Sequence, residues 1–383
     1  MDPVKPSLEL LRSLTDEHVL RALMRRQRLT RAELAAETGI SKPTVGESVR
    51  RLVDAGLVAD TGQRTAGGRG RGRVGSYYAL AGSVGVALAV SLAPEGIVAE
   101  CIDAHGDTVA RAQEKISRPA RPVQVAAALR TAAEKARRDT GLTPRLAVVS
   151  AADPVDRSTG RLVHLPDAPF LLGELDPAHI LAPHVDGPVT VDNDVNWAAQ
   201  AERAHARAAA LDDVTYLFLG EGLGCAVISD GRVRRGHAGL AGEIAHLITV
   251  GPRGQALPFI EVFSELGLRR TGSTAIDVGR LLTATTDPGP QAAATRHILG
   301  QAVTGVLAAV MALTDPELII IGGSWGSSPV ILETIAAGTA RLPRAVPVRA
   351  AELTGNPSLA GARIDALSRL RSDIIAAPRP NRH

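Results

Sequence analysis

Two short segments in the second half of the chain hold acidic, amide and imidazole side chains at close spacing. The first is Asn193-Asp194-Val195-Asn196, which follows a predicted strand at residues 189–191. A carboxylate at a strand end beside an amide donor is suited to take a proton from a hydroxyl group. The same residues are also typical of a helix N-terminus, where the Asn side chain caps free N–H groups. From the residues alone, both interpretations of this segment stay open.

The second segment is Gly242-Glu243-Ile244-Ala245-His246. Glu243 and His246 lie three residues apart, and this spacing is typical of a partly buried ion pair on one face of a helix. The chain has two cysteines, Cys101 and Cys225, and none follows His246. A disulfide scaffold and a zinc site with three or four thiolates are therefore excluded.

A different chemistry is expected at the N-terminus, where the positive charge is concentrated. Residues 1–80 contain 14 Lys and Arg against 9 Asp and Glu, a net charge of +5, whereas the remaining residues carry 29 against 31, or −2. A basic segment on a near-neutral body predicts a polyanion partner for one domain only. The chain has few aromatic residues, 2% of the total, which disfavours a stacking surface for single-stranded bases.

The elements expected in this basic segment are those of a helix-turn-helix. A helix is predicted over residues 16–27. Thr30 and Glu33 form a capping box at the start of a second helix, which ends at Gly39. Ser41 caps a third helix with Pro43 in its first turn. Two strands, at residues 57–59 and 76–80, then flank a loop that is rich in arginine and has no acid, as a DNA-binding wing requires.

The third helix is expected to present an inner apolar face and an outer polar face. The inner face is predicted to hold Val45, Val49, Leu52 and Val53. Base contacts are predicted for Lys42, Thr44 and Ser48, and phosphate contacts for Arg50, Arg51 and the wing residues Arg69, Arg71 and Arg73. Taken singly, three short helices are also typical of a plain helical subdomain, and an Arg- and Gly-rich loop is typical of a linker. Their order favours a partner that is double-stranded DNA.

The rest of the chain alternates apolar strands with Ala-rich helices, which predicts an α/β body. Strands are expected at residues 84–92, 98–102, 146–149, 189–191, 215–219, 226–229 and 318–321, and helices at 123–138, from 193 past 202, and at 301–313. The expected domains are residues 1–80 and 81–383. No apolar run approaches 18 residues, so no membrane span is expected. The two cysteines and the lack of a signal peptide lead us to expect a reducing, cytoplasmic location.

Four segments of the body resemble the ROK family of repressors and sugar kinases. They are PVTVDNDVNWAAQA from Pro188, GEGLG from Gly220, DGRVRRGHAGLAGEIAHL from Asp230 and IIIGGSWG from Ile319. The resemblance implies a two-lobed, actin-like sugar-kinase fold, with lobes at residues 81–190 plus the C-terminal helix and at residues 191–364. With the N-terminal domain, this is the layout of the repressor branch, whose members assemble as homodimers or homotetramers.

The same resemblance implies roles for particular residues. In the family the Asp that matches Asp194, next to Asn193, takes the proton of the sugar hydroxyl that is phosphorylated. Glu243 and His246 match residues that bind sugar hydroxyls, and Glu261 falls where a further sugar-binding Glu is placed. The implied ligand is a sugar effector or a related polyol.

Departures from the family pattern argue against an enzyme. We expect the family's phosphate hairpin, which supports a metal ion and approaches phosphate, to be replaced at Ala87, Ala89, Val90 and Ser91. Glu221 stands where a Thr is typical and would repel a nucleotide. The family's zinc array has no cysteines here, and Asp153 replaces a glycine of the sugar-approach loop. We therefore expect no catalytic residue, no metal and no cofactor.

The sequence predicts a DNA-binding transcriptional regulator, a repressor, whose inactive kinase-like body senses a sugar. Two alternatives stay open. The first is a constitutive regulator whose body only mediates assembly, which Asp153, Ala245 and the missing zinc array favour. The second is an active sugar kinase with a DNA-binding arm, which Ala87 disfavours.

Overall fold

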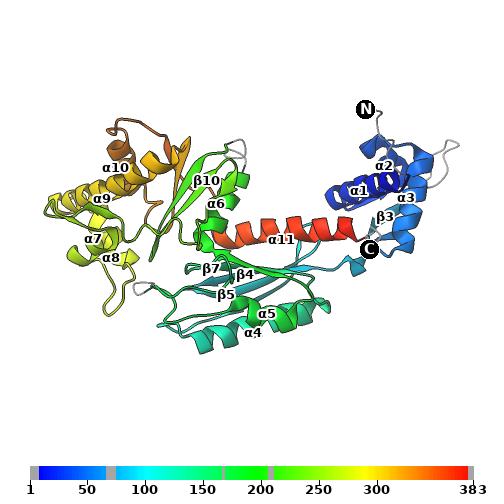
Figure 1. Cartoon of the computed structure of the whole chain (residues 1–383), viewed down its shortest axis with the longest axis horizontal. Coiled ribbons are helices and arrows are strands. Elements are labelled where there is room, and N and C mark those ends of the chain that lie inside the picture. The colour runs from blue at the N-terminus through cyan, green and yellow to red at the C-terminus, as the bar shows by residue number, and fades with distance from the viewer. Residues whose placement is uncertain (1–7, 66–74, 166–168, 206–210, 378–383) are drawn as a thin grey trace.

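The computed structural model describes residues 8–65, 75–165, 169–205 and 211–377. It has a small N-terminal head, formed by residues 8–65 and 75–80, and a larger body built on two five-stranded sheets (Figure 1). The long C-terminal helix α11 (Pro357–Ala376) runs from the middle of the body to the head.

The head is a winged helix-turn-helix, as the sequence predicts. Its elements are α1 (Leu8–Arg26), β1 (Arg28–Thr30), α2 (Arg31–Thr38), α3 (Lys42–Asp54), β2 (Val58–Arg64) and β3 (Ser76–Leu80). In its antiparallel sheet, β3 lies between β1 and β2. The capping box of Thr30 and Glu33 is present, Gly39 ends α2 at a φ of 70°, and the Ser41 side chain accepts the N–H of Thr44 at the start of α3.

The head is built on an apolar core to which each of its helices contributes. Its fully buried residues include Leu20, Leu23, Leu34, Val49 and Leu52. Helix α1 begins at Leu8, well before the expected residue 16. Val53 is 39% exposed, so its predicted place on the inner face of α3 is wrong. The buried stripe of α3 follows Val45, Val49 and Leu52, and Val53 lies one residue past the edge of that stripe.

The first lobe of the body is a sheet in the order β6-β5-β4-β7-β8. Its strands are β4 (Ala87–Ala93), β5 (Gly96–Ile102), β6 (Thr108–Glu114), β7 (Ala147–Ala151) and β8 (Val189–Asn193). β4 is antiparallel to β5 and parallel to β7, and β7 is parallel to β8. Helices α4 (Pro122–Thr140) and α5 (Pro177–Leu181) cover one face and α11 covers the other, as Figure 1 shows. A short 3-10 turn precedes β4 at Gly82–Val84 and another follows α5 at Ala182–His184.

The second lobe is a sheet in the order β11-β10-β9-β14-β15. Its strands are β9 (Val214–Leu219), β10 (Leu223–Ser229), β11 (Arg232–Val233), β14 (Leu318–Gly322) and β15 (Val348–Ala350). One face is covered by the hairpin β12 (Ile248–Val250) with β13 (Ala256–Pro258) and by helices α7 (Phe259–Glu265), α8 (Val278–Thr286), α9 (Pro290–Thr314) and α10 (Pro329–Thr339). Strands alternate with helices in both lobes, so the α/β prediction is confirmed.

Helix α9 is longer than the predicted helix at residues 301–313. Its length and composition would also suit a membrane span, so the expectation that no segment has this property is wrong. Leu299, Val303, Val306 and Leu307 are buried in the core of the second lobe. These contacts are those of the central helix of a folded lobe.

Helix α6 (Asp194–Ala204) connects the two lobes. Its residues Val195, Ala198 and Ala199 pack on the second sheet, on the face opposite α9. Its other side meets α11, where a Cβ on Gly361 would lie 2.0 Å from the Trp197 carbonyl oxygen. The backbones of α6 and α11 are therefore in direct contact, and α11 in turn packs on the first sheet.

The head and the body share one apolar cluster. It joins Leu20 and Leu23 of α1 to Leu370 and Ile374 near the end of α11. Polar contacts reinforce this junction, since the Ser83 hydroxyl donates to the Gly56 carbonyl oxygen over 3.0 Å. The head is thus packed against the first lobe.

Candidate functional site

The exposed face of α3 carries the polar side chains that the sequence predicts for DNA contact. Lys42, Thr44 and Arg50 are exposed, as is the acidic Glu47. Thr44 shares a hydrogen bond of 2.8 Å with the cap residue Ser41 at the start of the helix. These side chains project from one side of a helix whose other side is buried in the head core.

Two residues predicted on this face lie elsewhere. Ser48 is fully buried and its hydroxyl donates to the Asp16 carboxylate of α1, so its predicted outward position is wrong. Arg51 donates to the same carboxylate, with 2.6 Å from Nη2 to Oδ1. Ser48 falls between Val45 and Leu52 at helical spacing, so the periodicity of α3 already favoured an inner position.

The predicted wing residues Arg69, Arg71 and Arg73 lie outside the described residues. The strands that flank them, β2 and β3, are paired as a hairpin from Val58 opposite Leu80 to Arg64 opposite Ser76. Arg64 forms an ion pair of 3.0 Å with Asp60 on the same strand.

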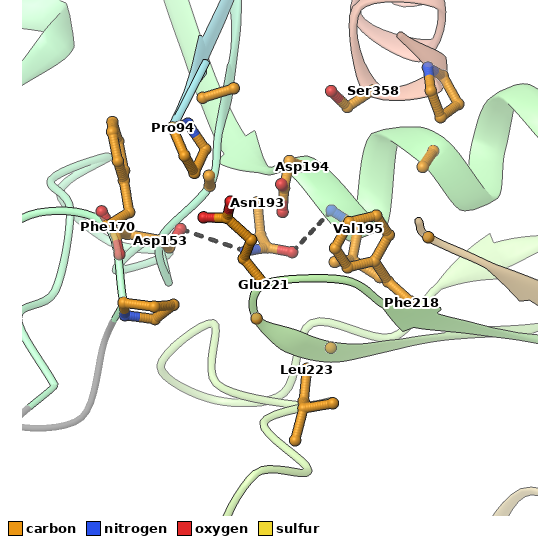
Figure 2. A pocket seen from close by; sticks show the side chains of 18 of the residues that line it. Pro94, Asp153, Phe170, Asn193, Asp194, Val195, Phe218, Glu221, Leu223 and Ser358 are labelled. Atoms are coloured by element: carbon orange, nitrogen blue, oxygen red, sulfur yellow. Dashed lines mark hydrogen bonds between the residues drawn. The ribbon is translucent and has the colours of Figure 1, made fainter. Parts of the chain in front are cut away.

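A cavity of about 1010 Å³ lies between the two lobes of the body. Figure 2 shows residues of both lobes around it. The first lobe supplies the turn at Pro94 and Glu95 and the segment after β7 that contains Asp153. The second lobe supplies Phe218 and the turn between β9 and β10, and the N-terminus of α11 adds Ser358.

The NDVN segment lies at the wall of this cavity, at the junction of β8 and α6. Asn193 caps α6, since its Oδ1 accepts the N–H of Val195 over 2.9 Å, and its Nδ2 donates to the backbone oxygen of Asp153 over 3.2 Å (Figure 2). Asn193 and Asp194 both line the cavity. Asn196 instead turns away and donates to Asp192 over 2.9 Å. The helix-cap interpretation is confirmed, and the cap holds Asp194 at the cavity.

Glu243 and His246 also line the cavity, from the segment between β11 and β12. This segment is irregular, so the alternative that places them on a helix is wrong. Gly242 fixes its path, because it has a φ of 99° and a Cβ there would lie 1.8 Å from the Cys225 carbonyl oxygen. The Gly242 carbonyl in turn accepts the N–H of Cys225 over 3.0 Å. The backbone pairing with β10 thus sets the position of the neighbouring Glu243.

Glu261 does not line this cavity. It lies in the first turn of α7, where its Oε1 is 3.0 Å from Nη2 of Arg269. The sequence placed it with the other predicted ligand residues, whereas the structure gives it a partner in its own lobe.

Three residues with carboxyl side chains, Asp153, Asp194 and Glu243, line the cavity. Burial raises the pKa of Glu243 to about 7 and that of Asp194 also to about 7, with Glu243 adding repulsion to Asp194. Burial, followed by the charges of Asp194 and Glu243, raises the pKa of Asp153 to about 8, and donation of a hydrogen bond by the Leu171 backbone N–H opposes this rise to a smaller extent. Close carboxylates that are poorly hydrated hold protons to higher pH than usual. The sequence singled out Asp153 as a departure but not as part of this cluster.

The turn of the first lobe that lines the cavity lies further along the sequence than predicted. Ala87, Ala89, Val90 and Ser91 are buried inside strand β4, so their predicted position in a phosphate hairpin is wrong. The register pairs Ala93 with Gly96, which puts Pro94 and Glu95 at the turn. Pro94 has no N–H to donate, and Glu95 has a negative charge, so this turn is poorly suited to hold phosphate.

Glu221, in the turn between β9 and β10, is held by two arginines. Its carboxylate lies 2.6 Å from Arg118 of the first lobe and 2.5 Å from Arg270 of the second. The Arg118 pair connects the two lobes beside the cavity. The negative charge of Glu221 is therefore neutralised by two ion pairs, one to each lobe, whereas the sequence analysis expects an isolated negative charge at this position.

These features define a class of protein: a winged helix-turn-helix head on a two-lobed, actin-like α/β body with a cavity between its lobes. Residues 88–364 match the model of the ROK family, and residues 12–59 match a model of winged helix-turn-helix DNA-binding domains. Because the first match covers most of the chain, the chain belongs to the ROK family.

The curated relatives of the chain include enzymes and a repressor. The N-acetylmannosamine kinase of Citrobacter koseri is 32% identical over 148 residues, which are 36% of this chain and 50% of the kinase. The bifunctional enzyme NanE/NanK of Brucella suis is 29% identical over 45% of this chain and 34% of that enzyme. A xylose repressor of Caldicellulosiruptor bescii is 41% identical over 59 residues, 15% of each chain. The matches to the two enzymes span between a third and a half of their lengths.

Solved structures share the fold. A ROK family transcriptional regulator, described as a homolog of the E. coli MLC protein, is similar over 96% of this chain and 98% of its own, with a TM-score of 0.65 and 18% identity. A ROK family glucokinase from Streptomyces griseus, in complex with glucose and AMPPNP, is similar over 74% of this chain and 100% of its own, with a TM-score of 0.57 and 23% identity. At these identities the likeness concerns the fold alone.

Proposed function

We propose that the chain is a cytoplasmic transcriptional repressor whose head binds double-stranded operator DNA and whose body binds a sugar or related small molecule without phosphorylating it. The observation that carries this proposal is the exposed polar face of α3, on a head that shares its core with a cavity-bearing body. The whole-length likeness to a ROK transcriptional regulator supports the same arrangement.

In this proposal α3 enters the major groove. Lys42 and Thr44 at its exposed N-terminal end contact base edges, and Arg50 contacts phosphate. The wing arginines 69, 71 and 73 add phosphate contacts. The chain acts as a homodimer or homotetramer, and the half-sites for a symmetric pair of heads lie about one helical turn, or multiples of it, apart.

The ligand binds between the lobes. Asn193, Asp194, Glu243 and His246 line that cavity and provide acceptors and donors for hydroxyl groups. Pockets of this kind orient a small molecule with a few polar groups on an otherwise apolar wall. The xylose repressor and the sugar kinases among the relatives support a sugar-like ligand.

Phosphoryl transfer depends on groups that position and neutralise the phosphates, and the chain is poorly equipped for this role. The turn of Pro94 and Glu95 lacks an N–H at one position and repels phosphate at the other. Glu221 engages both Arg118 and Arg270, so these cations are already neutralised. We therefore propose that Asp194 serves in binding. An ATP-consumption assay with a panel of hexoses is expected to show no turnover, and sugar-dependent ATP hydrolysis would favour the kinase alternative.

Helix α11 offers a physical connection from cavity to head. Asn356 and Ser358 at its start line the cavity. Near its end, Arg371 donates to the carbonyl oxygens of Ala104 and His105 over 2.8 and 3.2 Å. The His105 ring lies 3.3 Å from the Met24 carbonyl oxygen of α1. A ligand that prefers one lobe arrangement would thereby shift the head geometry, with a typical coupling of about 1 to 3 kcal/mol.

The test is a gel-shift of the full chain on the DNA upstream of its own coding region, repeated with a panel of sugars. We expect a sequence-specific shift that at least one sugar weakens or strengthens. A specific shift that no sugar changes, together with no heat of sugar binding by calorimetry, would favour the constitutive regulator. The absence of any specific shift would contradict the regulator proposal.

A further inference from the structure

The cavity between the lobes is large for a single sugar ring. Its volume of about 1010 Å³ lies at the upper end of the roughly 300 to 1,000 Å³ that is typical of pockets for drug-sized ligands. In the first lobe its lining extends from Asn193 at the end of β8 to Gln113 in β6, across the full order of the five-stranded sheet. Because neighbouring strands lie about 4.8 Å apart, this wall is on the order of 19 Å wide. One pyranose ring would therefore fill only part of the cavity.

The polar residues of the proposed sugar site occupy one part of this cavity. Asn193 and Asp194 belong to that part, at the junction of β8 and α6. Another part is lined by Phe218 at the end of β9 and by Ser324 and Ser327 in the segment between β14 and α10. In Figure 2 the ring of Phe218 lies to one side of Asn193 and Asp194. The cavity thus has a second region that the proposed sugar contacts leave unused.

The position of the Phe218 ring depends on a neighbouring glycine. A Cβ on Gly220 would lie 2.7 Å from Cε1 and 2.8 Å from Cζ of Phe218, so the absence of a side chain there leaves room for the ring. The same point is 3.6 Å from the Ser324 hydroxyl oxygen, which places that hydroxyl near the edge of the ring. Phe218 is partly exposed and packs on the apolar cluster that includes Val195. Since Val195 directly follows Asp194, the ring lies next to the polar part of the cavity.

Both polar backbone groups of Gly220 are bonded within the second lobe. Its N–H donates to the Gly222 carbonyl oxygen over 3.0 Å, and its carbonyl oxygen accepts the indole N–H of the buried Trp325 over 2.9 Å. Phosphate sites in turns of this kind use free backbone N–H groups. At this residue the turn between β9 and β10 is therefore better suited to an apolar ring than to an anion.

We propose that the cavity binds a glycoside with two rings, in which a sugar ring lies at Asn193 and Asp194 and the second ring packs on Phe218. This inference rests on the proposed ligand-sensing function and specifies the class of the ligand. One face of a pyranose ring has mostly C–H groups, so it packs on an aromatic ring as other apolar surfaces do. Ser324 and Ser327 are exposed in the same region and can bond the hydroxyl groups of a second sugar ring. A disaccharide is therefore the expected ligand.

The experiment is isothermal calorimetry of the full chain against matched glycosides of glucose, galactose and mannose. Each methyl glycoside is compared with the phenyl glycoside and with disaccharides that have the same sugar at the non-reducing end, such as maltose, cellobiose, lactose and mannobiose. We expect at least one two-ring compound to bind about tenfold tighter than its methyl glycoside, which corresponds to burial of roughly 50 Å² more apolar surface. A gain for disaccharides identifies the second ring as a sugar, and a gain for phenyl glycosides alone identifies it as aromatic.

Two variants test the region that would hold the second ring. F218L keeps an apolar side chain on the cluster around Val195 but removes the flat ring, so it should reduce the preference for two rings to about twofold or less. S324A should weaken binding of a disaccharide by about two- to fivefold, because it removes one hydrogen-bonding group. The matched control is S264A, at an exposed position of α7, which should keep the full preference. Circular dichroism should show all three variants folded.

The outcomes separate this inference from the function on which it rests. Two-ring glycosides that bind no tighter than the methyl glycosides, or an F218L variant that keeps the preference, would overturn the inference and leave sugar sensing intact. Binding of no compound of either kind, with DNA binding unchanged, would overturn the inference and the sensing function together.

Discussion

At the scale of single residues, Asp153 makes stability depend on pH. Its pKa is raised from 3.8 to about 8, so the folded chain binds its proton more tightly than the unfolded chain does. The contribution of Asp153 to the free energy of unfolding should therefore be largest below about pH 4 and fall as pH rises towards 8, by an amount on the order of several kcal/mol.

D153N should remove much of this dependence, because an amide cannot ionise. Thermal melts at about pH 5 and about pH 8.5 should show the variant gaining stability over the parent chain chiefly at the higher pH. D186N, the same substitution at an exposed residue of the first lobe, should follow the parent at both. A D153N variant that melts lower than the parent chain at alkaline pH would contradict the assignment of Asp153 as a buried acid with a raised pKa.

Asp16 supports the head from inside. It is 7% exposed and accepts from both Ser48 and Arg51. D16A should destabilise the head by about 3 kcal/mol, since it leaves a buried hydroxyl and a guanidinium without their acceptor. K42A should instead lower DNA affinity while leaving the melting temperature unchanged. Differential scanning calorimetry and fluorescence anisotropy separate the two effects, and a D16A variant with unaltered melting would refute the structural role.

Some of the contacts between single residues could be predicted from the sequence and others could not. Asn193, Asp194, Glu243 and His246 were expected to act together, and the structure brings all four to one cavity. The partner of Ser48 could not be foreseen, because Asp16 lies on another helix and contributes no local pattern. The pairing of Glu261 with Arg269 depends on the irregular path of the chain after α7, which hydrophobic periodicity does not specify.

At the scale of elements, the two helices that begin at the cavity, α6 and α11, pack directly against each other and so hold the two lobes together. Gly361 is required there, because a methyl group would overlap the Trp197 carbonyl oxygen. G361A should lower stability by about 1 to 3 kcal/mol, the typical effect of overpacking. S368A, at an exposed position of the same helix, is the control and should melt as the parent chain does. Equal melting temperatures for all three proteins would show that the helices are not packed this closely.

Capping residues and turn glycines in the sequence predict most of the helices and strands correctly, but they do not predict all of the residues at which these elements begin and end. The capping box at Thr30 and the turn at Gly39 place α2 correctly, because both features act within a few residues. Helix α9 starts at Pro290 instead of residue 301. Its first turns contain polar residues, and one of them, Arg296, donates to the carbonyl oxygen of Thr285 in α8, a contact that local periodicity does not predict. The order of strands in each sheet requires pairings between distant segments, and no sequence pattern specified it.

At the scale of the whole molecule, the Arg118–Glu221 ion pair links the lobes next to the cavity. If ligand binding requires the lobes to be held together, R118A should weaken sugar binding by a few fold, in line with the energy of about 1 kcal/mol or less for an exposed ion pair. R161A removes an ion pair with Glu174 inside the first lobe and serves as control. Calorimetry with the tightest-binding sugar measures both variants, and equal affinity for R118A and the parent chain would exclude this role.

Binding of duplex DNA by the head is proposed to occur through α3. It is tested most directly by fluorescence anisotropy of the full chain on its upstream DNA over a range of salt concentrations. We expect measurable affinity at low salt that falls as salt rises, with R50A reducing the slope of log affinity against log salt by about one for its lost phosphate contact. No affinity for any duplex at low salt would contradict the account, and so would an affinity that salt and R50A leave unchanged.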